Sequence, residues 1–214
     1  MKGTVIFVSS NKETPEFEKH IIDDLKSKVG DLEVVSVTQK IVDLGDNIIV
    51  GDVGASGFNF CRQVLLACMM ARGDYVISAE SDCLYSPDYF KFIPERLDIP
   101  YRNTNIYVQK YAQDFACKKT MSTFSQVVGR DFYVSRLKSL LDGLPMWNTE
   151  YKNFPKEIGK KLFNEFETFE TIYPCVSFKT GLGMRKHSNT DEVPVYELPY
   201  WGSVGELRKK YEAN

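Results

Sequence analysis

Two carboxylates stand two residues apart, directly after an apolar segment in the middle of the chain. Glu80 and Asp82, within the sequence SAESDCLYSPDYF, follow the run YVISA at residues 75–79. Alternate residues of a strand share a face, so a strand that ends here aims both carboxylates at one point just beyond its end. Hard divalent cations such as Mg²⁺ and Mn²⁺ bind oxygen ligands and keep open water positions. The spacing alone is more typical of a solvated acidic turn, but the predicted helix, Gly-Asp and strand before it and the sequence LYSPDYF after it favour a metal site.

The segments before this acidic pair alternate between β-rich runs and helical patterns. Thr14 is a suitable N-cap, Pro15 suits the first helical position, and Gly30 is a suitable end, which together predict a helix between them. Further elements are predicted as strands at 4–10, 32–37, 48–50 and 75–79, and a buried helix at 59–73. This alternation predicts an α/β sandwich with a mainly parallel central sheet and helices on both faces. The carboxyl ends of its strands would then line one edge, where open α/β sheets bind ligands.

The second half of the chain has a looser pattern. Its predicted elements are a strand at 104–112, helices at 130–144 and 155–169, and a late strand at 173–181, followed by a Gly-rich basic loop and a polar tail. We interpret this half as an extension that completes one domain over residues 1–214. Within this single domain we distinguish a core at residues 1–141 from an extension at residues 142–214.

The composition suits a globular protein without an extreme charge. The 214 residues are 43% hydrophobic and 26% charged, with a net charge of −2, which gives no strong electrostatic case for general nucleic-acid binding. Five cysteines without a C-x-x-C spacing predict reduced thiols rather than disulfides or a zinc site. We see no signal peptide and no apolar run near the ~20 residues of a membrane span, so we expect a cytoplasmic protein.

The segment GFNFCRQVLLACMMARGDYVISAESDCLYSPDYF, residues 57–90, resembles the middle of a GT-A fold glycosyltransferase. The likeness is to family 2 in character, in its compact phage and bacterial form. It consists of an Asn or Arg near the start of an Ala-rich helix, a Gly-Asp end, an apolar strand, a D-x-D-type motif and a following Pro. Glu80 replaces the first Asp of that motif. The resemblance covers residues 4–141 well and the remainder loosely. It implies that residues 1–141 form the nucleotide-sugar-binding core and that residues 142–214 bind the acceptor and supply a closing loop.

This resemblance implies transfer of a sugar from a nucleotide-sugar donor, in the first place a UDP-sugar, to an acceptor hydroxyl. Mn²⁺ or Mg²⁺ would neutralise the charge that develops on the leaving diphosphate. Asp82 would ligate the metal, and Glu80 would bind it through water or hold the donor's ribose. The nucleoside would be held by residues at the ends of the first and third strands, namely Ser9, Ser10, Asn11 and Asp52.

Basic residues in two places could contact the diphosphate. Arg62 lies one turn into the buried helix, and because an unpaired buried guanidinium is costly, we expect it to pair with the acidic motif or to contact the donor. The sequence KTGLGMRKHSNT at 179–190 predicts a mobile loop in which Arg185 and Lys186 complement a diphosphate by charge. By the resemblance, His187 of this loop would be the third metal ligand.

An inverting transferase also needs a carboxylate base near the acceptor hydroxyl. Glu150, in PMWNTEY, is our first candidate because an aromatic residue beside an acid suits an acceptor site, and Asp131 and Glu167 are its rivals. A retaining enzyme would not need this base in the same place, so both stereochemical outcomes stay open.

Other functions and several acceptors are compatible with these residues. A nucleotidyltransferase acting on a sugar phosphate shares the α/β sandwich and the metal-binding acids, but it normally carries a Gly-rich signature after the first strand, where this chain has SSNKETPEFEK. A third hypothesis, after the glycosyltransferase and the nucleotidyltransferase, is a non-catalytic nucleotide-sugar-binding protein. The acceptor could be a saccharide, a protein or a modified DNA base, such as a hydroxymethylated base in phage-type DNA. The sequence gives no indication of the oligomeric state.

Overall fold

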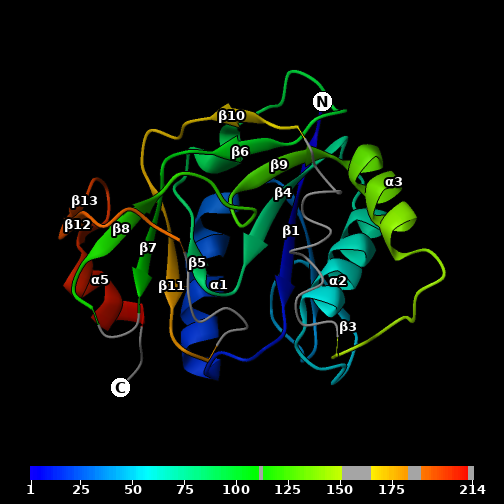
Figure 1. Ribbon diagram of the computed structural model, residues 1–214, viewed down its shortest axis with the longest axis horizontal. Helices are drawn as coiled ribbons and strands as arrows, with labels where there is room; N and C mark the ends of the chain where they lie inside the picture. The colour runs from blue at the N-terminus through cyan, green and yellow to red at the C-terminus, as the bar shows by residue number, and fades with distance from the viewer. Residues whose placement is uncertain (111–112, 151–164, 183–188, 212–214) are drawn as a thin grey trace.

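The structure is a computed structural model that describes residues 1–110, 113–150, 165–182 and 189–211 (Figure 1). A central sheet has the strand order β10-β6-β9-β4-β1-β2-β3, and a second sheet has the order β12-β8-β7-β11-β5. The central strands are β1 (Gly3–Ser9), β2 (Glu33–Thr38), β3 (Asp46–Ile49), β4 (Tyr75–Glu80), β6 (Tyr101–Asn103), β9 (Gln126–Gly129) and β10 (Glu167–Phe169). The remaining strands are β5 (Cys83–Leu84), β7 (Ile106–Lys110), β8 (Ala116–Lys119), β11 (Cys175–Lys179) and β12 (Pro194–Val195), with a small hairpin of β13 (Glu197–Leu198) and β14 (Gly202–Ser203).

The helices are α1 (Pro15–Val29), α2 (Gly57–Met70), α3 (Arg130–Leu141) and α5 (Val204–Tyr211), with a 3₁₀ turn at Tyr89–Lys91. Two of the helices, α1 and α2, begin at a side-chain cap. The Thr14 hydroxyl accepts the N–H of Phe17 at 3.3 Å, and the chain leaves α1 at Gly30 with a φ of 58°. The hydroxyl of Ser56 caps α2 in the same way. The predicted start and end of α1 are confirmed.

Helices cover both faces of the central sheet, as predicted (Figure 1). Alternate residues of β1 face opposite sides, so Val5 and Phe7 pack in one cluster while Ile6 and Val8 pack in another. The first cluster includes the Ile22, Leu25 and Val29 side of α1, and the second includes residues of α2 and α3. The Phe17 and Ile21 side of α1 packs against the second sheet, so α1 lies between the two sheets.

The central sheet is mainly parallel, and its parallel strands end together. Ser9 pairs with Thr38, Thr38 with Ile49, and Val8 with Glu80 in the parallel ladders. The carboxyl ends of β1, β2, β3 and β4 therefore meet at one edge, which we call the carboxyl edge. Strand β9 runs antiparallel to β4, with Gly129 opposite Tyr75 at the other edge.

The second half of the chain differs from the expectation in two places. The prediction of a helix at 155–169 is wrong at its end, because Glu167–Phe169 pair with β6 as strand β10. Residues 151–164 lie outside the described residues. The expected polar tail contains α5, whose buried Val204, Leu207 and Tyr211 pack beside α1 and the second sheet. Strands from both sides of residue 141 share each sheet, and the functional division at that residue stays a prediction.

Two observations bear on the environment of the protein. The five cysteines are free and buried, as the sequence predicts. In the part of the chain that the structure describes, no helix is both long and apolar enough to cross a bilayer.

Candidate functional site

The acidic pair lies at the carboxyl edge, and the residues that follow it anchor the end of β4. The hydroxyl of Tyr85 accepts the backbone N–H of Glu80 at 3.0 Å and donates to the carbonyl of Phe124 at 2.9 Å. Tyr89 donates to the carbonyls of Ser78 and Gln126, from neighbouring strands. Both rings are almost fully buried and stack with centroids 5.0 Å apart. The two tyrosines thus fix the strand end that carries Glu80.

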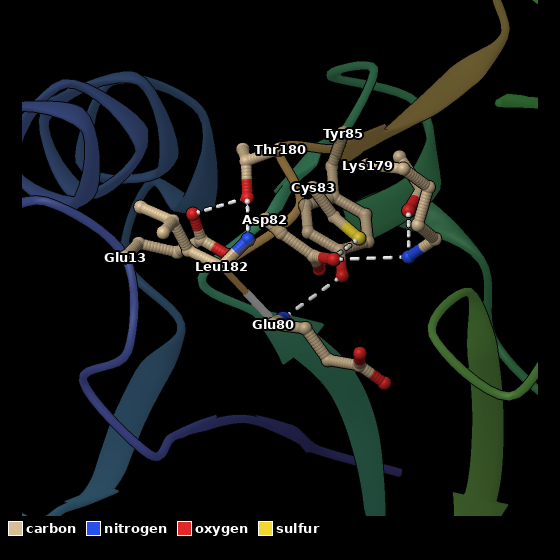
Figure 2. Close-up of polar contacts among 9 residues, drawn as sticks. Glu13, Glu80, Asp82, Cys83, Tyr85, Lys179, Thr180 and Leu182 are labelled. Atoms are coloured by element: carbon tan, nitrogen blue, oxygen red, sulfur yellow. Dashed lines mark hydrogen bonds and ion pairs between the residues drawn. The ribbon is translucent and has the colours of Figure 1, made fainter. Parts of the chain in front are cut away.

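Asp82 is held by a lysine that arrives from the second sheet. The ammonium of Lys179 lies 3.0 Å from Oδ2 of Asp82, and it also donates to the hydroxyl of Ser177 at 3.1 Å (Figure 2). The other carboxylate oxygen, Oδ1, accepts the thiol of Cys83 at 3.1 Å. The side chains of Lys179 and Asp82 are only 14% and 19% exposed, so this ion pair is largely shielded from water.

Backbone pairing explains why Lys179 reaches Asp82. Strand β11 runs antiparallel to β5, with Ser177 opposite Cys83 and Val176 opposite Leu84. The pairing continues one step further, because the N–H of Phe178 donates to the carbonyl of Asp82 at 2.7 Å. Lys179 therefore ends its strand beside the acidic motif, at a position fixed by main-chain hydrogen bonds.

A third carboxylate lies next to this ion pair. Glu13, in the segment between β1 and α1, is 8% exposed and accepts a 2.7 Å hydrogen bond from the hydroxyl of Thr180. The same hydroxyl oxygen accepts the N–H of Leu182 (Figure 2). The segment that follows Lys179 is thereby fastened to the loop that follows β1.

Burial and charge set the protonation of these groups. Burial raises the pKa of Glu13 above its usual value, although the hydrogen bond from Thr180 acts in the opposite direction. Burial lowers the pKa of Lys179, but the negative charge of Asp82 and its other acidic neighbours more than offset this, so its pKa is raised. Lys179 is therefore a permanent ammonium at neutral pH.

The carboxylate oxygens of the acidic motif, Glu80-Ser81-Asp82, are suitable ligands for a hard cation. Glu80, Asp82 and Cys83 each place one potential ligand atom within 4.8 Å of the others. Burial raises the pKa of the Cys83 thiol well above its usual value, and the Asp82 and Glu80 carboxylates raise it further, so this sulfur stays protonated. The carboxylates of Glu80 and Asp82 thus fit Mg²⁺ or Mn²⁺ once the ammonium of Lys179 has left Asp82.

The loop after β1 is tied down by its own polar side chains. The hydroxyl of Ser9 hydrogen bonds to the carboxylate of Glu18 and lies 3.1 Å from the hydroxyl of Ser81. Asn11 donates to Glu18 at 2.7 Å, and its side-chain oxygen accepts the N–H groups of Gln39 and Lys40. Its φ of 48° is in the left-handed region, which asparagine tolerates. Ser9 and Asn11 therefore join the ends of β1, β2 and β4.

Buried amides of α2 complete this scaffold. Gln63, 2% exposed, donates to the carbonyls of Ser9 and Val37 at the ends of β1 and β2. Asn59 donates to the carbonyls of Val53 and Gly54, in the loop that leads from β3 to α2. These contacts shape the carboxyl edge where Ser10, half-buried, and Asp52, exposed, also lie.

Arg62 does not contact the acidic motif, which corrects the expectation for it. Its Nη2 atom donates to the carbonyls of Leu141, Leu144 and Pro145 at 3.0, 2.8 and 2.7 Å. The first of these carbonyls belongs to the last residue of α3, where it also accepts the N–H of Leu144, and the other two follow the helix. These carbonyls thus account for Nη2 of Arg62, while its buried Nε has no hydrogen-bond partner among the described residues, and the expectation of a contact with the donor stays untested.

The candidate bases are separated by the fold. The N–H of Glu150 donates to Asn148, whose own N–H donates to Asn59 near the start of α2, so Glu150 lies at the carboxyl edge. Asp131 follows Arg130, whose N–H donates to the carbonyl of Asp74 before the start of β4. Asp131 is therefore at the opposite edge of the sheet from the acidic pair, and of these two candidates we keep Glu150 for the proposal.

Glu167, the other rival, begins β10 at the side of the central sheet, opposite Tyr101. Arg185, Lys186 and His187 lie outside the described residues, and their roles stay predictions. The sequence reasoning missed Lys179, Glu13 and Thr180. No local signal in the sequence places Lys179 beside Asp82, because its position depends on the pairing of β11 with β5.

No family model and no curated protein matches the chain. Solved structures match it at low identity. TarS 1–349 from S. aureus gives a TM-score of 0.51 at 15% identity, covering 84% of this chain and 61% of that chain. Another structure of S. aureus TarS gives 0.52 at 14% identity, covering 83% of this chain and 37% of that chain. The chain therefore spans less than two thirds of either protein.

The mainly parallel sheet flanked by helices in this chain matches the fold of the TarS structures. The chain has the GT-A fold. A mannosyltransferase from Pyrobaculum calidifontis in complex with GDP-Man and Mn²⁺ is a weaker match, with a TM-score of 0.46 at 16% identity, covering 82% of this chain and 56% of that chain. Likeness at these identities establishes the GT-A fold alone, because one fold can carry several activities.

Proposed function

We propose that the chain is a glycosyltransferase that moves a sugar from a nucleotide-sugar donor, in the first place a UDP-sugar, to an acceptor hydroxyl. The observation that carries this proposal is the position of Glu80 and Asp82 at the carboxyl edge of a GT-A sheet, beside the ends of β1 and β2. Ligands of open α/β sheets bind at such an edge. The polar ends of these strands suit a nucleoside and its diphosphate.

We assign Asp82 and Glu80 as the residues that would hold Mn²⁺ or Mg²⁺, with Glu80 acting through water or on the ribose. A divalent ion there supplies charge neutralisation for the departing nucleoside diphosphate. Ser10 and Asp52 are proposed to contact the nucleoside, since both lie at the carboxyl edge and neither is fully buried. Ser9 and Asn11 would position the loop after β1 beside the nucleoside through their contacts with Glu18.

Glu150 is our candidate for the proton acceptor in an inverting reaction. It is exposed at the carboxyl edge, where it can reach an acceptor bound from solvent. There it would take the proton of the attacking hydroxyl, and the oxygen would attack the anomeric carbon as the diphosphate leaves. Arg185, Lys186 and His187 keep their proposed roles in closing over the diphosphate and completing the metal site.

The buried free cysteines support a reducing compartment such as the cytosol as the site of this reaction. The acceptor is proposed only as a hydroxyl compound, and a hydroxymethylated DNA base, a saccharide and a protein are the candidates to test.

A panel of nucleotide sugars tests the donor class. With Mn²⁺ present, a bound UDP-sugar must raise the unfolding temperature by mass action, and EDTA should abolish the shift. ATP and CTP serve as comparison ligands, because they are the donors of a nucleotidyltransferase. Stabilisation by CTP or ATP with none by any nucleotide sugar would contradict the proposal.

A further inference from the structure

Lys179 stands in an unusual relation to the acidic motif. Its ammonium contacts Oδ2 of Asp82 at 3.0 Å, and Oδ1 of the same carboxylate is held by Cys83 at 3.1 Å. A carboxylate proposed to bind a metal thus already carries a cation of the chain itself. Both charged side chains are largely buried, so the attraction between them is weakly screened.

The lysine is placed there by the fold and not by chance contact of a surface chain. Strand β11 is fixed to β5 by its antiparallel register, and Ser177 gives the ammonium a second partner at 3.1 Å. Thr180, the next residue, is fastened to the buried Glu13. Asp82 and Ser177 therefore hold the ammonium, and the bond between Thr180 and Glu13 fixes the segment that follows it (Figure 2).

A divalent cation and this ammonium would compete for one carboxylate. A cation on Oδ2 would stand close to the Lys179 ammonium, and two positive charges at contact distance repel strongly in a site of low exposure. The lysine side chain is a flexible four-carbon chain with rotatable bonds, so the ammonium can leave Asp82 without any movement of strand β11.

We propose that Lys179 is a built-in competitor of the metal at Asp82, so that the ammonium and the divalent cation bind this carboxylate in turn. The inference rests on the proposed metal role of Asp82. It adds that the free protein is charge-compensated without metal, and that metal affinity is lowered by the need to displace Lys179.

The test is the affinity for Mn²⁺ without nucleotide, measured from the electron paramagnetic resonance signal of free Mn²⁺. Lys179→Met removes the charge and keeps an apolar chain, and Lys179→Arg keeps the charge. Lys19→Met is the matched control, because Lys19 pairs with Asp23 on the exposed side of α1. We expect Lys179→Met to bind Mn²⁺ about tenfold more tightly than the wild type, equivalent to about 1.4 kcal/mol. Lys179→Arg and Lys19→Met should stay within about twofold of the wild type, well below that tenfold effect.

The effect must also depend on Asp82. In an Asp82→Asn background, Lys179→Met should no longer tighten Mn²⁺ binding, because the shared carboxylate is gone. Should Lys179→Met not fold, Lys179→Gln keeps polarity and removes the charge, and the same comparison applies.

Equal or weaker Mn²⁺ binding by the folded Lys179→Met variant would overturn the inference, and so would a lack of Mn²⁺ binding by every variant. The proposed function has a separate readout in UDP-sugar binding by the wild type, measured by calorimetry. Loss of the lysine effect with intact UDP-sugar binding refutes only the competition. A preserved lysine effect without UDP-sugar binding refutes only the donor assignment.

Discussion

The hydroxyl of Tyr85 accepts the backbone N–H of Glu80 at 3.0 Å and donates a hydrogen bond to the carbonyl of Phe124 at 2.9 Å. One buried hydroxyl thus joins the end of β4 to the segment before β9. Tyr85→Phe leaves the N–H and the carbonyl without this partner. We expect it to lower the free energy of unfolding by about 1–3 kcal/mol and to weaken donor binding.

Urea unfolding and calorimetry with UDP measure these two effects. Tyr196→Phe is the control, because it removes the same hydroxyl from a tyrosine that is 55% exposed. A Tyr85→Phe protein as stable as the control would show that water replaces the hydroxyl at no cost.

Asn11 combines a positive φ of 48° with hydrogen bonds to Glu18, Gln39 and Lys40. Asn11→Gly and Asn11→Ala lose the same side-chain bonds, but glycine adopts this backbone conformation without strain. We expect Asn11→Ala to be less stable than Asn11→Gly by about 1 kcal/mol. Equal unfolding free energies in urea would mean that the loop relaxes to a negative φ.

Arg62 donates to carbonyls at and just after the end of α3, and we predict from this that it does not contact the donor. Arg62→Met should lower the unfolding free energy by about 1–3 kcal/mol and leave the affinity for UDP unchanged. Lys138→Met, an exposed lysine on α3, is the control for a lost charge. Weaker UDP binding by Arg62→Met at unchanged stability would return Arg62 to the donor site.

Glu33 gives a prediction for the pH dependence of stability. Its carboxylate accepts from the Thr4 hydroxyl at 2.6 Å and from the Arg72 N–H at 2.8 Å. Burial raises the pKa of Glu33, but these hydrogen bonds and the charge of Arg72 outweigh it and hold the pKa below 4.5. A depressed folded pKa means that the stabilisation is complete above the unfolded pKa and is lost as the pH falls through the folded value.

Glu33→Gln should therefore be less stable than the wild type at pH 7, by about 1 kcal/mol, and the difference should shrink below pH 4.5. Urea unfolding from pH 7 to pH 3 measures it. A difference that stays constant with pH would show that the ionised form of Glu33 carries no advantage.

The sequence predicted the parts of this fold that rest on local signals. The cap at Thr14, the break at Gly30 and the alternation of β1 through β4 each depend on neighbouring residues, and these elements are confirmed. The same local reasoning led to the carboxyl edge, because the ends of parallel strands must lie together.

The missing parts depend on pairings between distant segments. Strand β5 has only the residues Cys83–Leu84, and its partner β11 lies about ninety positions later in the chain. The local sequence therefore does not predict that these two strands pair. The contact of Lys179 with Asp82 follows from that pairing. The expected pairing of Arg62 with the acidic motif is wrong because the sequence shows a buried charge but not which group satisfies it.

The central claim is that the carboxylates at the end of β4 hold a divalent ion through which the protein uses a nucleotide-sugar donor. It is tested most directly by UDP release from UDP-sugars with Mn²⁺, in the wild type, Asp82→Asn and Asp131→Asn. Asp131 is the matched control, since it is an exposed aspartate at the opposite edge of the sheet. We predict UDP release by the wild type and Asp131→Asn, and a loss of about 100-fold or more in Asp82→Asn. Equal rates in Asp82→Asn and the wild type, or no UDP release by any of the three proteins, would contradict the claim.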